Sequence, residues 1–254
     1  MLESIILIQV CREMNRIMKI LKKIFSVPED YIKSVEAYKS MDAIRAIGVF
    51  AAVFVLYALC GVVALKTDDA GQRWVGILLN GICIGIVFIL MRYQKEGLET
   101  VGLKGGNIKL TLIIGCAVGA LLFFLNGLSN IWFAGKSFVS ADRILIDILF
   151  YLFVALSEEL VFRGYILTRL YGLVKNVYVD MLIAALLFVL MHFPYRMVAY
   201  QMSFVDFITN VDRVSDLFIT GLWLSYIRIK TNSLYGAILP HWMSDLAYDI
   251  VTHV

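Results

Sequence analysis

The stretch "ILIDILFYLFVALSEELVFRG", residues 144–164, begins as an apolar run long enough to enter a bilayer and then places Glu158, Glu159 and Arg163 in succession. Each of these ionisable groups would cost roughly 2.5 to 3.5 kcal/mol if it faced lipid from the centre of a spanning helix. The three side chains must therefore face protein or a wet cavity. That requirement indicates a bundle of membrane helices with a polar centre.

The composition of the whole chain supports this fold class. The 254 residues are 61% hydrophobic and 17% charged, and the mean hydropathy is +0.82. These values fall in the range of polytopic membrane proteins. A formal net charge of +3 is too small to indicate a nucleic-acid partner. The cysteines lack the spacing of a zinc site or a disulfide framework, so we expect reduced thiols at Cys11, Cys60, Cys83 and Cys116.

Seven apolar stretches predict about seven spans of an all-α, polytopic transmembrane helical bundle. They cover residues 44–65, 74–92, 109–128, 143–168, 178–194, 214–229 and 233–252. Basic residues are more frequent in the segments that would be internal if the N-terminus is cytoplasmic, so the positive-inside rule predicts this orientation. We expect a multi-pass protein of the cell membrane whose transmembrane domain covers residues 41–254.

Residues 1–40 are predicted to form a cytoplasmic amphipathic segment that lies at the membrane interface. Between residues 12 and 25, apolar side chains recur with helical spacing, and basic side chains occupy the other face. This helix could anchor the chain to the lipid bilayer or bind a partner. It could also serve only to set the orientation of the spans.

The charged residues of the opening stretch divide by helical spacing. Glu159 and Arg163 are four residues apart and share one face, where they can form an ion pair, while Glu158 points about 100° away. The charge of Glu159 is thereby neutralised, and the carboxylate of Glu158 stays free to take part in a reaction. The alternative is a purely structural cluster of charges that ties helices together.

Two other predicted spans carry polar residues at a similar depth. His192 lies near the end of the fifth span, and His241 and Asp245 share a face of the last span. Counted at about 1.5 Å per residue from the inner ends, their depths agree with that of Glu158 to within about one helical turn. A buried carboxylate with two imidazoles can activate water, and a histidine beside a carboxylate can stabilise an oxyanion.

Each of the two histidines has a proline close by: Pro194 follows His192 by two residues, and Pro240 directly precedes His241. They either unwind the backbone to admit an extended substrate or simply end their helices.

At these residues the chain resembles the CAAX protease and bacteriocin-processing (CPBP, or Abi) family of intramembrane proteases, relatives of the type II CAAX prenyl endopeptidases. Three motifs occur in the family's order over roughly residues 140–250. They are EExxxR at Glu158, Glu159 and Arg163, FxxxH at Phe188 and His192, and HxxxD at His241 and Asp245.

The resemblance implies that the chain hydrolyses peptide bonds without a cofactor. Glu158, aided by His192, would activate water, His241 and Asp245 would form the oxyanion site, and Glu159 and Arg163 would give structural support. The substrate would be a membrane-associated peptide or protein, such as a prenylated CAAX-type protein or a leader, pheromone or bacteriocin peptide. The basic amphipathic start and the low proline content suit a bacterial enzyme.

One position departs from the prenyl endopeptidase pattern, which has Asn where this chain has Asp245. An ionised Asp can only accept hydrogen bonds, so either Asp245 is protonated or it holds His241 as a cation. Glu158, His192 and His241 also form a set of side chains that could bind a catalytic zinc ion, which we keep as an alternative.

Two other functions fit the same polar residues. A non-proteolytic bacteriocin-immunity or signalling-scaffold protein would use them only for structure. A proton-coupled transporter would use Glu158 as a relay, although the sequence shows no inverted repeat.

Overall fold

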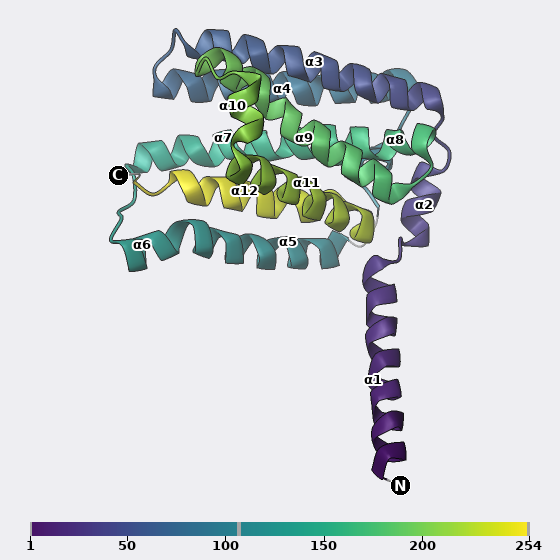
Figure 1. Ribbon diagram of the computed structural model, residues 1–254. Helices are drawn as coiled ribbons and strands as arrows, with labels where there is room; N and C mark the ends of the chain where they lie inside the picture. The colour runs from purple at the N-terminus through teal and green to yellow at the C-terminus, as the bar shows by residue number, and fades with distance from the viewer. Residues whose placement is uncertain (1, 106–107, 253–254) are drawn as a thin grey trace.

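The computed structural model describes residues 2–105 and 108–252, with side chains from residue 12 onward, and this part of the chain is mostly helical (Figure 1). The long helices are α3 (Ser40–Ala64), α4 (Asp69–Gln94), α5 (Ile108–Phe123), α7 (Ala141–Glu159), α9 (Val177–Ala199), α11 (Val211–Thr231) and α12 (Tyr235–Asp249). Shorter elements are α2 (Glu29–Val35), η1 (Leu98–Val101), α6 (Ser129–Ala134), α8 (Leu167–Val174) and α10 (Phe204–Thr209). Two π-helical segments, η2 (Phe124–Leu128) and η3 (Leu160–Ile166), join α5 to α6 and α7 to α8.

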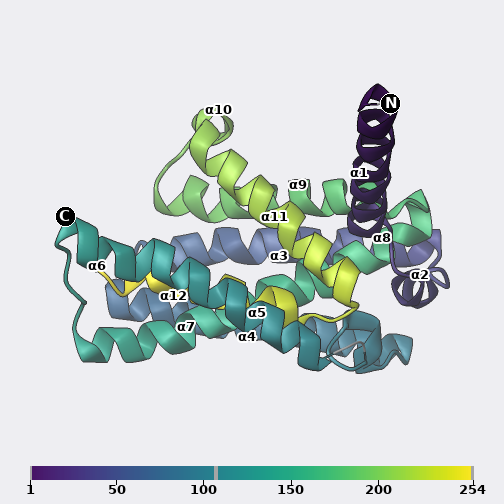
Figure 2. The same ribbon diagram turned by 90° about the horizontal axis from the view of Figure 1, so that it is seen from below.

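The long helices run roughly parallel or antiparallel in layers (Figures 1 and 2). α3 and α4 form one layer, α5 and α6 form the opposite one, and α7, α9, α11 and α12 lie between them. α12 packs against both α5 and α7, and α3 packs against α9. The central helices therefore have protein on several sides, which is where polar groups can be sheltered from lipid.

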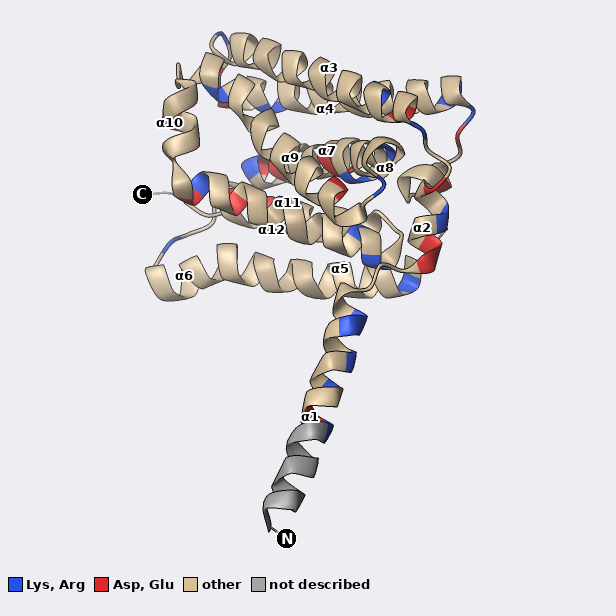
Figure 3. Ribbon diagram, turned by 45° about the vertical axis from the view of Figure 1, so that its right-hand side comes forward, with Lys and Arg blue, Asp and Glu red and all other residues tan. Residues whose placement is uncertain are grey.

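All seven predicted apolar stretches are helical, so the all-α membrane bundle is confirmed. Among the described residues, four helical stretches are long and apolar enough to cross a membrane: Ser40–Ala64, Asp69–Gln94, Ile108–Ala134 and Val177–Ala199. The other three stretches remain predictions as spans. Figure 3 shows α3, α4 and α5 uncharged along most of their length, with charged residues mainly toward their ends. This pattern is typical of helices that pass through a hydrocarbon layer.

The first helix, α1 (Leu2–Phe25), projects from one end of the bundle, roughly at right angles to the long helices (Figures 1 and 2). Its last turn is fixed to the bundle: Lys230 Nζ donates to the carbonyls of Lys23 (2.8 Å) and Ser26 (2.6 Å), and Tyr226 donates to that of Ile24 (3.1 Å). A lysine at a helix C-terminus also complements the helix dipole. The direction of α1 is the one that an interfacial helix would take.

The rest of the predicted 1–40 segment belongs to the packed body. Tyr31 and Val35 of α2 are buried in the main apolar cluster, so only α1 stands apart from the bundle.

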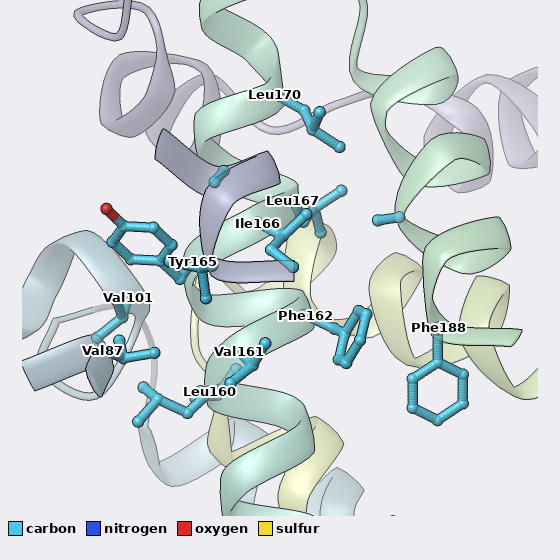
Figure 4. Packing of buried hydrophobic residues seen from close by; sticks show 14 of the residues in the cluster. Val87, Val101, Leu160, Val161, Phe162, Tyr165, Ile166, Leu167, Leu170 and Phe188 are labelled. Carbon is cyan, nitrogen blue, oxygen red and sulfur yellow. The ribbon is translucent and has the colours of Figure 1, made fainter. Parts of the chain in front are cut away.

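The main apolar cluster surrounds η3 (Figure 4). The ring of Phe162 meets that of Phe188 on α9 edge to face, with centroids 5.3 Å apart. Every residue of η3 is buried. The segment that follows the paired glutamates is thus the centre of the bundle, which fixes the glutamates in place.

Candidate active site

The helix that carries the paired glutamates is not the single regular helix predicted over residues 143–168. It changes from α to π directly after Glu159 and returns to α at Leu167. Within the π segment, the Gly164 carbonyl accepts hydrogen bonds from Thr168 Oγ1 (2.8 Å) and Arg169 Nη1 (3.1 Å). These side chains stabilise a backbone that deviates from regular α-helix, and such deviations occur frequently at functional sites.

Glu159 and Arg163 form the ion pair that their spacing predicts, at 2.8 Å, and both side chains are almost fully buried. The guanidinium also lies 4.2 Å from the centroid of the Phe188 ring. Glu159 has a second partner that the helical spacing does not reveal: His241 Nδ1, at 2.7 Å. Because His241 belongs to α12, Glu159 links the two helices that carry the first and third motifs.

The His241 ring lies among three carboxylates. Its Nδ1 faces Glu159, while its Nε2 lies 3.3 Å from Asp245 Oδ2 and 3.7 Å from Glu158 Oε2. The first of the Nε2 distances is within hydrogen-bond reach and the second exceeds it. Glu158, His241 and Asp245 are therefore brought together from two helices.

Glu158 is buried, with 6% of its surface exposed, and its other carboxylate oxygen faces α3. Tyr57 donates a hydrogen bond of 3.3 Å to Glu158 Oε1, and the same hydroxyl lies 3.3 Å from Asn80 Oδ1 on α4. Neither Tyr57 nor Asn80 was predicted from the sequence as a site residue. Each is a single polar side chain within an apolar run, so only the packing of α4 against α7, and of α3 against α4 and η3, reveals its place.

His192 approaches the site from α9. Its Nδ1 lies 2.8 Å from the carbonyl oxygen of Phe188, one turn earlier in the same helix. Because a carbonyl oxygen can only accept, Nδ1 carries a proton, which leaves Nε2 of a neutral ring as an acceptor. The Phe188 ring packs against both imidazoles, and its centroid lies 5.0 Å from that of His192 and 6.2 Å from that of His241.

A cavity of about 930 Å³ joins these groups. Glu158, His192, His241 and Asp245 all line it, and so do Arg196, Tyr200, Arg213 and Asp216 nearer the connection between α9 and α11. Arg213 and Asp216 are 43% and 64% exposed, so the cavity reaches the surface at that end. Its volume is in the range of ligand sites.

The two prolines do not end their helices. Pro194 and Pro240 lie inside α9 and α12, which continue to Ala199 and Asp249. The interpretation of the prolines as helix terminators is therefore wrong. A proline within a helix still removes one backbone hydrogen bond, and here this happens within two residues of His192 and directly before His241.

Within the described part of the chain, no three His, Cys, Asp or Glu side chains are grouped so that they could hold a metal ion. The thiols of Cys60, Cys83 and Cys116 are free, and the side chain of Cys11 lies outside the described residues.

Residues 140–247 match the family model described as type II CAAX prenyl endopeptidase Rce1-like. The match includes all six residues of the three motifs that were singled out as site residues, and it leaves out Tyr57 and Asn80. No curated protein and no solved structure matches the chain.

Proposed function

The chain belongs, through residues 140–247, to the family of CAAX proteases, and on that premise we propose that it is a glutamate-dependent intramembrane endopeptidase. The observation that carries the proposal is that Glu158, His192, His241 and Asp245, from three different helices, line one cavity. Its substrate would be a membrane-associated peptide or protein that reaches the cavity in an extended conformation.

In the proposed reaction, Glu158 acts as the general base. It accepts a proton from a water molecule as the water oxygen bonds to the carbonyl carbon of the substrate. His192 Nε2 accepts a hydrogen bond from the other O–H of that water and orients it. The tetrahedral intermediate then collapses: the C–N bond breaks and Glu158 returns its proton to the leaving nitrogen. A positioned general base of this kind contributes typically about 10²- to 10⁴-fold to the rate.

His241 would stabilise the negative charge that develops on the carbonyl oxygen. Its Nδ1–H donates to Glu159, and its Nε2 faces Asp245 at 3.3 Å. Carboxylates on both sides of the ring favour a cation with a proton on each nitrogen. Of the two roles left open for Asp245, we therefore propose that it holds His241 as a cation, whose Nε2–H donates to the oxyanion.

In this scheme Glu159 and Arg163 act through His241. Arg163 pairs with the buried Glu159 carboxylate, and Glu159 fixes the orientation of the imidazole. No step of the scheme requires a metal ion. The wider membrane assignment, with a cytoplasmic N-terminus, would place the mouth of the cavity on the outer side.

The test is a quantitative comparison of peptide termini in membranes of cells that carry the wild type, Glu158→Gln or Asp212→Asn at matched protein levels. Asp212 lies on the exposed start of α11 and receives the same carboxylate-to-amide change. Termini that are present with the wild type and Asp212→Asn and absent with Glu158→Gln would identify the substrate. Identical termini in all three samples would refute proteolysis and favour a bacteriocin-immunity or scaffold function.

A further inference from the structure

The polar contacts of Glu158 extend into a part of the chain that the family match does not cover. Tyr57 on α3 and Asn80 on α4 form a chain of contacts with Glu158, in which the Tyr57 hydroxyl lies 3.3 Å from both Glu158 Oε1 and Asn80 Oδ1. Neither Tyr57 nor Asn80 is among the described side chains that line the cavity. They therefore lie on the side of Glu158 that faces away from the cavity.

The orientation of the Asn80 amide is fixed. Asn80 is 3% exposed, and its Nδ2 donates to the carbonyl of Gly76, one turn earlier, at 2.8 Å. The amide oxygen is therefore the atom that faces Tyr57. It can accept a hydrogen bond from the hydroxyl and cannot donate one.

The Tyr57 hydroxyl thus has two acceptors within reach and a single proton. While Glu158 is a carboxylate, the hydroxyl can donate to Oε1, since a hydrogen bond to a charged acceptor is the stronger one. When Glu158 takes the proton from water on Oε2, the oxygen directed toward His241 and the cavity, Oε1 becomes the carbonyl oxygen of a neutral acid and a weaker acceptor. The Tyr57 hydroxyl can then turn to Asn80 Oδ1, and it returns to Oε1 when Glu158 gives up the proton, so it has an acceptor in each protonation state of Glu158.

We propose that Tyr57 and Asn80 are positioning residues that form a hydrogen-bond relay behind Glu158: the Tyr57 hydroxyl holds Oε1 of the carboxylate and turns to Asn80 Oδ1 while Glu158 carries the proton. The inference rests on the proposed function, because it assumes that Glu158 takes up and returns a proton. Holding Oε1 from behind leaves Oε2 directed toward His241, 3.7 Å from its Nε2.

The experiment measures kcat and KM of the purified protein in liposomes, with the substrate identified by its peptide termini, for Tyr57→Phe, Asn80→Ala and the double variant. The matched control is Tyr165→Phe. Tyr165 is buried, and its hydroxyl donates a hydrogen bond to a residue of α4, Gln94 Oε1, at 3.1 Å. Neither Tyr165 nor Gln94 is among the described residues that line the cavity. We expect Tyr57→Phe to lower kcat about tenfold or more, which corresponds to the loss of one hydrogen bond to a charged group, with KM within about twofold of the wild type.

The relay predicts a specific pattern among the variants. Asn80 acts only through Tyr57, so Asn80→Ala lowers kcat by itself but adds no loss to Tyr57→Phe. A purely structural role would instead lower the melting temperature while kcat per folded molecule stays at the level of Tyr165→Phe. That result, or losses that multiply in the double variant, would overturn the proposal.

The wild type and Glu158→Gln are measured first, to separate the two hypotheses. Equal cleavage by both would refute the proposed function itself. Loss of cleavage in Glu158→Gln with full kcat in Tyr57→Phe would refute only the relay. If Tyr57→Phe does not fold, Asn80→Ala decides: a lower kcat at unchanged KM supports the relay, and an unchanged kcat contradicts it.

Discussion

Replacing Arg163 with Met should destabilise the bundle because it removes one of the two partners of the buried Glu159 carboxylate and leaves only His241. The two side chains are 1% and 0% exposed and lie 2.8 Å apart, so water cannot replace the guanidinium. Removing one partner of a buried ion pair costs about 3 to 5 kcal/mol. At about 2 to 4 °C per kcal/mol for a protein of this size, the melting temperature should fall by about 6 to 20 °C.

The measurement is thermal unfolding of the purified protein in detergent micelles, followed by tryptophan fluorescence. Arg213→Met is the matched control, because its ion pair with Asp216 is exposed and should contribute at most about 1 kcal/mol. The double variant Glu159→Gln with Arg163→Met removes both charges and should regain much of the lost stability. A melting temperature for Arg163→Met within about 2 °C of the wild type would show that the buried ion pair does not stabilise the bundle.

Three further predictions concern packing, cofactors and orientation. Gly172→Ala should destabilise the protein by about 1 to 3 kcal/mol or more, because an added Cβ would lie 2.2 Å from the Lys39 carbonyl oxygen. An added Cβ at Gly48 would have no atom within 4 Å, so the control Gly48→Ala should leave the melting temperature unchanged or raise it. Equal effects of the two substitutions on the melting temperature would contradict this packing. Cleavage should persist after dialysis against a zinc chelator. If dialysis abolishes cleavage and added zinc restores it, the alternative of a catalytic zinc ion would be favoured. The orientation is tested in a variant without the native cysteines, treated in intact cells with a thiol reagent that does not cross the membrane. A cysteine at Lys33 (Lys33→Cys) should not react, and one at Asp206 (Asp206→Cys) should react. The reverse pattern would contradict a cytoplasmic N-terminus.

The helical spacing of charged residues was a reliable guide within each helix. Glu159 and Arg163 pair as expected, and His241 and Asp245 lie on one face. These contacts depend on the backbone between residues four apart, which the sequence specifies directly. The contact of Glu159 with His241 joins residues 82 positions apart, and no local pattern encodes it. Glu159 was therefore predicted to pair with Arg163 alone.

The regular helix predicted through Glu158 was wrong in one respect, the π-helical segment over Leu160–Ile166. Its stabilising bonds come from Thr168 and Arg169, which lie beyond the segment. The apolar periodicity of this stretch is too short to distinguish a π turn from an α turn. Tyr57 and Asn80 illustrate a further limit, because a single polar residue in a membrane span gains meaning only from what packs opposite it.

The most direct test of the central claim compares the wild type with Glu158→Gln on the identified substrate, using folded protein in liposomes. Glutamine keeps the size of the side chain but cannot take a proton from water. We expect the rate of cleavage to fall by about 10²- to 10⁴-fold, with the melting temperature close to that of the wild type. Cleavage by Glu158→Gln at a rate within a few fold of the wild type would show that Glu158 is not the general base.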